Sequence, residues 1–343
     1  MRELLGTLYV TTRGAVLRLE HDTVRIIVEG ETLARLPLVR LQAIVVFGGV
    51  AVTTPLIHRC AEDGRGLVWM TTRGRFRARL TGRTLGNVLL RRAQHEVLDD
   101  LSHTLGVARQ YVAGKVQNTR TLVLRAAREA PNHDDQAELS IVADTLGGLL
   151  DNIREAPELD ALRGLEGIAA RTYFGAFGRM VRGDRAAFTP EGRTRRPPRD
   201  RANALLSFCY ALLRGECEAA LEGVGLDPQV GYLHALRPGR PALALDLMEE
   251  LRPAVADRFV LRMVNRRQVR ASHFDRTPGG AVSLNEDGRR AVLAAYEKRK
   301  GEPVQHRLLQ ERIPVGLIPH VQARVLARPL RGDLQHYLPY LAR

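Results

Sequence analysis

Gly231 to Arg252 reads GYLHALRPGRPALALDLMEELR, and this stretch decides how the rest of the chain is interpreted. A histidine, His234, is followed by a turn rich in proline and glycine and then by a helix with acids on one face. Asp246 and Glu249 are three residues apart and so are neighbours on that face. Carboxylates this close repel each other unless a positive charge lies between them. Because an imidazole with carboxylates suits Mg²⁺ or Mn²⁺, the stretch predicts a metal site.

The same stretch also has simpler interpretations. The acids of DLMEEL would fit the solvated edge of an amphipathic helix whose apolar stripe is Leu243, Leu247 and Leu251. Glu250 lies four residues from Asp246 and is easily mistaken for a member of the acidic pair. A single histidine is more often a core or surface residue than a ligand. Taken alone, the stretch leaves a metal site and an ordinary helix both open.

A third acid lies far upstream. Glu166 heads an apolar face on which Ala170, Tyr173 and Phe177 follow at helical spacing. An acid on a buried face is costly unless it is paired or bound to a metal. Glu166 is therefore either a further ligand or the partner of one of the many arginines.

A loop rich in proline and arginine separates Glu166 from His234. Residues 188–201 read FTPEGRTRRPPRDR, and arginines this dense need solvent, acids or phosphates. The planar guanidinium suits phosphate oxygens, so we expect a DNA-binding loop, with a disordered surface loop as the alternative. The assigned DNA-binding residues are Arg193, Arg195, Arg196 and Arg199. After His234, Arg237 and Arg240 either hold a DNA phosphate or are solvated turn residues.

The composition favours a nucleic-acid partner. The 343 residues include 52 Lys and Arg against 38 Asp and Glu, a net charge of +14. Only 5% of residues are aromatic, which fits binding to a duplex backbone better than stacking on single strands. A further basic run suits either a DNA-facing helix or an exposed one: Arg262, Arg266, Arg267 and Arg270.

Cysteine usage and hydropathy indicate the compartment. The three cysteines form no Cys-x-x-Cys pair, which disfavours a zinc or redox motif. We find neither a secretory signature nor an apolar run of about 20 residues. We therefore expect a cytoplasmic protein that does not span a membrane.

The spacing of apolar residues changes once along the chain. Short alternating segments separated by turn residues continue to about residue 82, and helical spacing follows from about residue 85. We therefore expect an α+β protein, with a small β-rich domain at 1–84 and a larger all-α domain at 85–343. Pro253 predicts that the helix with the acids bends or ends one turn beyond them.

Three stretches together resemble one family. They are LEGIAARTYFGAF, RRPPRDRANALLSFCYALL and GYLHALRPGRPALALDLMEELRP, and they resemble Cas1, the CRISPR-associated integrase family of spacer acquisition. The opening, LLGTLYVTTRGAVLRLE, is similar to the subtype I-C branch. The resemblance covers essentially the whole chain.

By motif position, the resemblance implies that Glu166, His234 and Glu249 bind Mg²⁺ or Mn²⁺. It implies that Asp246 is a supporting catalytic acid. It also implies that Tyr210, in the apolar helix after the arginine loop, lies near the active site. The alternative for Tyr210 is a core tyrosine whose hydroxyl is satisfied by hydrogen bonding.

The family reaction would be metal-dependent phosphoryl transfer. The resemblance implies a DNA endonuclease and integrase in which a 3′-hydroxyl of spacer DNA attacks a phosphodiester of the repeat array. The implied partners are double-stranded DNA (prespacer and CRISPR repeat), a second copy of the chain in a homodimer, Cas2 and, in subtype I-C, Cas4. Two other functions stay open: a non-catalytic, arginine-rich DNA-binding scaffold, and a repair nuclease acting on branched DNA.

Overall fold

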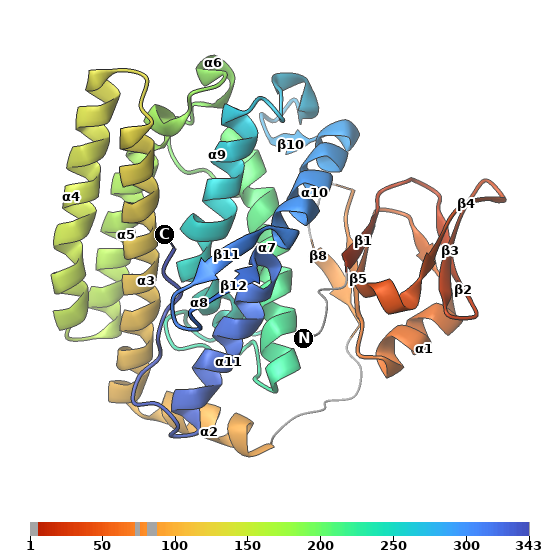
Figure 1. The fold of residues 1–343 in the computed structure, drawn as a ribbon, viewed down its shortest axis with the longest axis horizontal. Helices are drawn as coiled ribbons and strands as arrows, with labels where there is room; N and C mark the ends of the chain where they lie inside the picture. Colours follow the sequence, from red (N-terminus) through yellow and green to blue (C-terminus); the bar gives the residue numbers. More distant parts are fainter. Residues whose placement is uncertain (1–5, 73–75, 81–87, 343) are drawn as a thin grey trace.

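The chain folds into a β-rich part and a larger helical part that lie next to each other (Figure 1). The computed structural model describes residues 6–72, 76–80 and 88–342. The expected fold class is confirmed: a β-rich N-terminal domain precedes a larger helical one. The predicted domain boundary near Thr84 lies outside the described residues.

Two four-stranded sheets build the β-rich part. The first contains, in order across the sheet, β1 (Gly6–Val10), β5 (Leu41–Phe47), β7 (Gly66–Met70) and β8 (Phe76–Arg79). The second contains β4 (Glu31–Pro37), β3 (Thr23–Val28), β2 (Val16–Glu20) and β6 (Ala51–Val52). Because strands place alternate residues on opposite faces, Leu17, Val24 and Ile44 all reach one buried core.

Helix α1 (Thr54–Glu62) packs against this core. It begins after Thr53, with Pro55 in its first turn, where the missing N–H of proline is not needed. Its buried residues, Leu56 and Cys60, pack among the strands.

Helices dominate from residue 88 onward. They are α2 (Val88–Asp99), α3 (Leu101–Arg128), α4 (His133–Glu155), α5 (Leu159–Ala176), α6 (Arg185–Phe188), α7 (Arg201–Val224), α8 (Ala242–Leu251), α9 (Arg258–Asn265), α10 (Glu286–Gly301) and α11 (Ile318–Leu330). Short 3₁₀ turns are η1 (Leu38–Arg40), η2 (Phe177–Met180), η4 (Ala271–His273) and η5 (Val315–Leu317), and η3 (Arg252–Asp257) is a π-helix. No described helix is both long and apolar enough to cross a bilayer.

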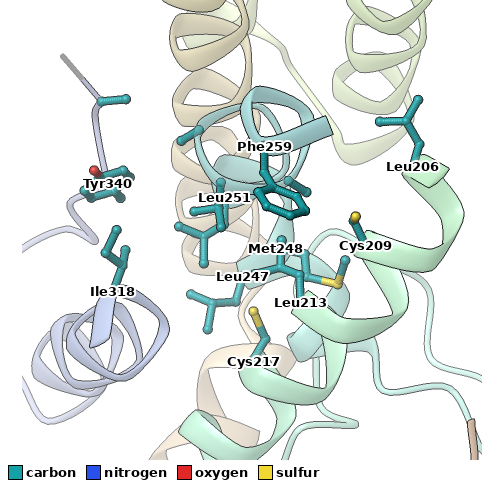
Figure 2. Packing of buried hydrophobic residues seen from close by; sticks show 14 of the residues in the cluster. Leu206, Cys209, Leu213, Cys217, Leu247, Met248, Leu251, Phe259, Ile318 and Tyr340 are labelled. Carbon is teal, nitrogen blue, oxygen red and sulfur yellow. The ribbon is translucent and has the colours of Figure 1, made fainter. Parts of the chain in front are cut away.

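Helix α8 lies at the centre of the helical part. Figure 2 shows Met248 of α8 beside Leu213 of α7, with Leu247 and Leu251 of α8 and Phe259 of α9 in the same cluster of buried side chains. Every residue of α8 except Leu245 is buried, its three acids included. The interpretation of DLMEEL as a solvated helix edge is therefore wrong.

The proline after the acids has the predicted effect. The regular α-helix ends at Leu251, and Pro253 lies in the first turn of the wider π-helix η3. The chain then continues directly into α9. Prolines and π-turns are common causes of local distortion in helices, and here both lie between α8 and α9.

The helical part also contains two short hairpins that we did not predict. Strands β9 (Phe274–Arg276) and β10 (Val282–Leu284) form one, and β11 (Pro303–His306) and β12 (Glu311–Pro314) form the other. Both are antiparallel and only three or four residues long in each strand. Such short strands give little periodic signal.

Charged side chains join the two parts of the molecule. Arg79 of β8 forms ion pairs with Glu218, at 3.2 Å, and with Glu222, both on α7. Lys300 of α10 lies 3.2 Å from the hydroxyl of Thr7 in β1. Helix α7 therefore contacts both the first sheet and α8.

Candidate catalytic site

Asp246 binds the segment that precedes α8 and so holds this segment against the helix. Its Oδ2 accepts hydrogen bonds from the backbone N–H groups of Tyr232, at 2.6 Å, and Leu233, at 3.0 Å. Its Oδ1 accepts the backbone N–H of His234 at 3.0 Å and lies 2.6 Å from Nδ1 of the same residue. Asp246 is fully buried, so these contacts compensate for the loss of water around a carboxylate.

These contacts fix the orientation of His234. Because Nδ1 faces Asp246, Nε2 is the nitrogen turned toward Glu249, whose Oε1 lies 3.7 Å away. Arg163 of α5 holds the same segment by donating two hydrogen bonds, of 2.7 and 2.9 Å, to the carbonyl of Leu233. An acid behind the imidazole is the usual way in which proteins orient a histidine that binds metal.

The third predicted acid meets this pair through a lysine. Lys115, in the middle of α3, forms an ion pair with Oε1 of Glu166 on α5. The same ammonium lies 2.6 Å from Oε2 of Glu249 on α8. The structure therefore brings Glu166, His234 and Glu249 into one cluster. The partner of Glu166 is a lysine and not the arginine that we considered.

Glu249 is the electrostatic centre of this cluster. Burial by itself raises the pKa of its carboxyl group, but the charges of Arg252, Lys115 and His234 outweigh burial and lower that pKa below its usual value. Arg252 Nη1 lies 2.8 Å from Oε1. Glu249 is thus an ionised carboxylate inside the protein, with only 2% of its side chain exposed.

The residues present fit a divalent cation. Oε2 of Glu249 is buried, and the Lys115 ammonium lies 2.6 Å from it. Two carboxylates and an imidazole nitrogen are suitable donors for Mg²⁺ or Mn²⁺. Among the described residues, no group of His, Cys, Asp or Glu side chains is already arranged around an ion position. Lys115 supplies the positive charge between the two glutamates instead.

Glu250 points away from the cluster. Its Oε1 accepts hydrogen bonds from the hydroxyl of Tyr337, at 2.7 Å, and the side-chain amide of Gln322, at 2.9 Å. Burial raises the pKa of Glu250 to about 8, an effect that these two hydrogen bonds reduce. Glu250 therefore belongs to the packing between α8 and the C-terminal segment, and Glu249 alone of the two adjacent acids faces His234.

Tyr210 lies behind the cluster. Its hydroxyl donates a 2.6 Å hydrogen bond to Oδ1 of Asp257, the last residue of η3. Burial raises the pKa of Asp257 to about 6, and the hydrogen bond from Tyr210 works against this rise. The guanidinium of Arg252 lies over the Tyr210 ring, 5.3 Å from its centroid, and so links the tyrosine to Glu249.

The six assigned DNA-binding arginines fall into two groups. Arg193 is half-buried: it donates a 2.6 Å hydrogen bond to Oδ1 of Asn203, and its guanidinium lies over the rings of Phe174 and Tyr210. It therefore anchors the loop, and its contact with DNA stays a prediction. Arg240 is also half-buried. The exposed members are Arg195, Arg196, Arg199 and Arg237.

The arginine loop is an ordered element with fixed contacts. The side chain of Asp200 accepts the backbone N–H of Asn203 at 2.8 Å and caps α7. Asn203 in turn donates a 2.7 Å hydrogen bond to the carbonyl of Gly192. Arg195 lines a small cavity together with Lys115, Tyr210 and Arg252. This arrangement places exposed positive charge beside the carboxylate cluster.

A second basic cavity lies beside α9. It has a volume of about 550 Å³ and is lined by six arginines against two glutamates: Arg125, Arg182, Arg258, Arg262, Arg266, Arg299, Glu129 and Glu302. Glu302 is shared by Arg262, at 2.8 Å, and Arg299, at 2.6 Å. Among the described residues, no carboxylate lies within ion-pairing distance of Arg258. Burial and the neighbouring arginines lower the pKa of Arg258.

The sequence alone did not reveal Lys115, Arg252 or Asp257 as parts of the site. One signal was available for Lys115: it shares a face of its helix with the buried residues Tyr111, Val112 and Thr119. A lysine on a buried face is as costly as an acid there, so the two unexplained charges could have been paired with each other.

Comparison of sequences places the chain among CRISPR-associated proteins. Residues 8–298 match the profile of a family described as "CRISPR associated protein Cas1". A CRISPR-associated endonuclease Cas1 from Moorella thermoacetica is 54% identical over 343 residues, which cover 100% of both chains. A CRISPR-associated exonuclease Cas4/endonuclease Cas1 fusion from Rhodospirillum rubrum is 37% identical, over 98% of this chain and 57% of the fusion.

Comparison of structures gives the same fold. A Cas1 protein from Thermotoga maritima superposes with a TM-score of 0.82 at 26% identity, covering 96% of this chain and 98% of the other. A casposase bound to integration product gives 0.83 at 20% identity, with 97% and 92% covered. The complex titled Cas6-RT-Cas1–Cas2 gives 0.80 at 22% identity, covering 99% of this chain and 36% of the matched chain. At such identities the last two show the fold alone.

Proposed function

Because the chain belongs to the Cas1 family of CRISPR-associated proteins, we propose that Glu166, His234 and Glu249 carry out its DNA strand-transfer reaction. The protein is a CRISPR-associated DNA endonuclease and integrase of spacer acquisition. In strand transfer, a 3′-hydroxyl of the spacer DNA attacks a phosphodiester in the repeat array, and the former 3′-oxygen of the repeat leaves. When water replaces the attacking hydroxyl, the same site cuts DNA.

One observation supports this assignment most strongly. Lys115 contacts both Glu166 of α5 and Glu249 of α8, and His234 lies 3.7 Å from Glu249, although Glu166 and Glu249 are 83 positions apart in the chain. Glu249 is buried and Glu166 and His234 are partly buried, and ionisable side chains in such a position serve no packing purpose that apolar residues would not serve better. Their cost in stability is therefore evidence of function.

The metal ligands would be Glu166, His234 and Glu249. A bound Mg²⁺ or Mn²⁺ would polarise the phosphate and stabilise the negative charge that develops during transfer. The chain itself holds the imidazole through Asp246, so Asp246 acts as a positioning residue. Arg252 keeps Glu249 ionised, and Tyr210 with Asp257 keeps Arg252 in place.

DNA phosphates would be held by exposed arginines around this cluster. We propose Arg195, Arg196, Arg199 and Arg237 as direct contacts to phosphate. The half-buried Arg193 and Arg240 would support the arginine loop and the turn after His234, respectively. The cavity around Arg258 is a further phosphate contact, since its lining carries an excess of four positive charges. Duplex DNA, as prespacer and as CRISPR repeat, is the ligand that these surfaces fit.

The chain would act within a larger assembly. We propose a homodimer formed through the β-rich domain, a Cas2 partner and, in a subtype I-C system, a Cas4 partner. The Cas4/Cas1 fusion that is 37% identical supports the Cas4 pairing, because fused proteins act together. We further propose that the dimerisation domain spans residues 1–84 and the catalytic domain residues 85–343.

Substitution of Glu166 tests the proposal. We expect Glu166→Ala to abolish joining of labelled prespacer DNA to a plasmid carrying a repeat, while affinity for duplex DNA stays within about twofold of wild type. The matched control is Glu158→Ala, because Glu158 is an exposed acid directly before the same helix whose side chain makes no capping hydrogen bond. Loss of DNA binding and of fold in Glu166→Ala would instead mark Glu166 as structural. Joining that ignores the repeat would favour a general repair nuclease.

A further inference from the structure

Lys115 contacts the two carboxylates that are proposed to hold the metal. Its ammonium forms an ion pair with Oε1 of Glu166 and lies 2.6 Å from Oε2 of Glu249. The lysine side chain is 12% exposed, and that of Glu249 is 2% exposed. The three residues come from α3, α5 and α8, so this one ammonium links three helices.

The charges around Glu249 are divided between its two oxygens. Arg252 and His234 face Oε1, at 2.8 and 3.7 Å. Among the described residues, only Lys115 forms an ion pair with Oε2, at 2.6 Å. Without Lys115, Oε2 of the buried Glu249 and the carboxylate of Glu166, whose side chain is 28% exposed, would face each other with no cation between them. Like charges in such a position repel strongly.

We propose that Lys115 is the internal cation of this site: it holds Glu166 and Glu249 together before the metal binds, and it must leave their oxygens when the divalent ion enters. The proposal rests on the proposed function of these residues as metal ligands. Lys115 is then a positioning residue that competes with the metal ion for the oxygens of Glu166 and Glu249. It lowers the affinity of the site for metal, and it stabilises the folded site when no metal is bound.

The chemistry of lysine suits this role. An ammonium on a flexible four-carbon stem can move while its helix stays in place, which a planar, multiply bonded guanidinium does less readily. Lys115 also lines the cavity that contains Arg195 and Tyr210, with about 20 Å³ of space, room for one group the size of a water molecule. The displaced ammonium can therefore remain beside the cluster, where DNA phosphate would approach.

The test is Mn²⁺ binding to the full chain, measured by calorimetry and by electron paramagnetic resonance. We expect Lys115→Met to bind Mn²⁺ at least tenfold more tightly than wild type. Its melting temperature should be lower than that of wild type without metal, and saturating Mn²⁺ should narrow this difference. Lys115→Gln keeps a hydrogen-bond donor but removes the charge, so it should also bind Mn²⁺ more tightly and serves if Lys115→Met does not fold. Unchanged or weaker Mn²⁺ binding in the folded variants would overturn the proposal.

Two further variants separate the possible causes. Lys300 also bridges two glutamates, Glu216 at 3.2 Å and Glu297 at 3.1 Å, far from the cluster in sequence. Lys300→Met should lose stability without a change in Mn²⁺ affinity; a similar gain in affinity would contradict a specific role for Lys115. Glu249→Gln should weaken Mn²⁺ binding. If Glu249→Gln binds Mn²⁺ as tightly as wild type, the proposed ligands are wrong. If Glu249→Gln binds Mn²⁺ more weakly but Lys115→Met binds it as wild type does, only the role of Lys115 is contradicted.

Discussion

Asp246 receives hydrogen bonds from three consecutive backbone N–H groups and faces Nδ1 of the third residue's imidazole. From the sequence, its spacing from Glu249 predicted a shared helix face, and resemblance to the Cas1 family implied a supporting catalytic acid. The structure specifies how the support is given: Asp246 orients His234. The role of Lys115 could not be predicted in this way, because its partners lie 51 and 134 residues away along the chain.

Asp257 provides a pH-dependent test of the packing behind the site. Burial raises its pKa to about 6, above the usual value of an aspartate, so the folded protein binds this proton more tightly than the unfolded chain does. This contribution of Asp257 to the free energy of unfolding is fully present below the pKa that Asp257 has in the unfolded chain. It is lost as the pH rises through about 6. We expect wild type to lose about 1 kcal/mol more unfolding free energy than Asp257→Asn between about pH 5 and about pH 8. Urea unfolding at both pH values measures this difference, and parallel pH profiles would contradict it.

The element that builds the site is the segment from Gly231 to the end of α8. Pro253 follows the end of the regular helix as the sequence predicted, since α8 spans Ala242–Leu251. The burial of α8 on nearly all sides was missed, because its surroundings come from α3, α7 and α11, which no local pattern reveals.

Gly231 allows this segment to lie against the start of α8. A Cβ atom there would lie 2.6 Å from the carbonyl carbon of Ala242 and 2.7 Å from the nitrogen of Leu243. We expect Gly231→Ala to cost about 1–3 kcal/mol of stability through overpacking. Because the displaced segment carries His234, strand transfer should also fall. Chemical denaturation and a joining assay measure the two effects.

Gly164 offers the matched control. It lies within α5, and a Cβ atom there would meet nothing within 4 Å. Gly164→Ala should therefore leave stability unchanged or raise it by up to about 1 kcal/mol, because alanine is the better helix former. Equal effects of the two substitutions would contradict the close packing at Gly231.

At the scale of the whole molecule, the change from alternating to helical spacing correctly predicted a β-rich domain followed by a helical one. The strand Glu31–Pro37 and the two hairpins were not recognised. In β4, residues alternate between exposed and partly buried, so it carries no buried stripe. The net charge of +14 predicted a polyanionic partner but did not indicate where it binds.

Arg258 tests whether the cavity beside α9 contacts DNA. We expect Arg258→Gln to weaken duplex binding several-fold near physiological salt and to reduce the slope of log K against log salt by about one. Fluorescence anisotropy at several salt concentrations in EDTA measures both quantities. Arg331→Gln is the control, because Arg331 is exposed and already paired with Asp333 at 2.8 Å. An unchanged slope in Arg258→Gln would remove this cavity from the DNA interface.

The central claim is that His234 and a divalent ion act together in strand transfer. The most direct measurement is joining of labelled prespacer DNA to a plasmid carrying a CRISPR repeat, with a Cas2 partner present, in Mn²⁺ and in EDTA. Wild type and the exposed-histidine control His336→Ala should join DNA in Mn²⁺ and not in EDTA. His234→Ala should be slower by about 100-fold or more in Mn²⁺ while still binding DNA. Joining by His234→Ala at the wild-type rate, or joining by wild type in EDTA, would contradict this account.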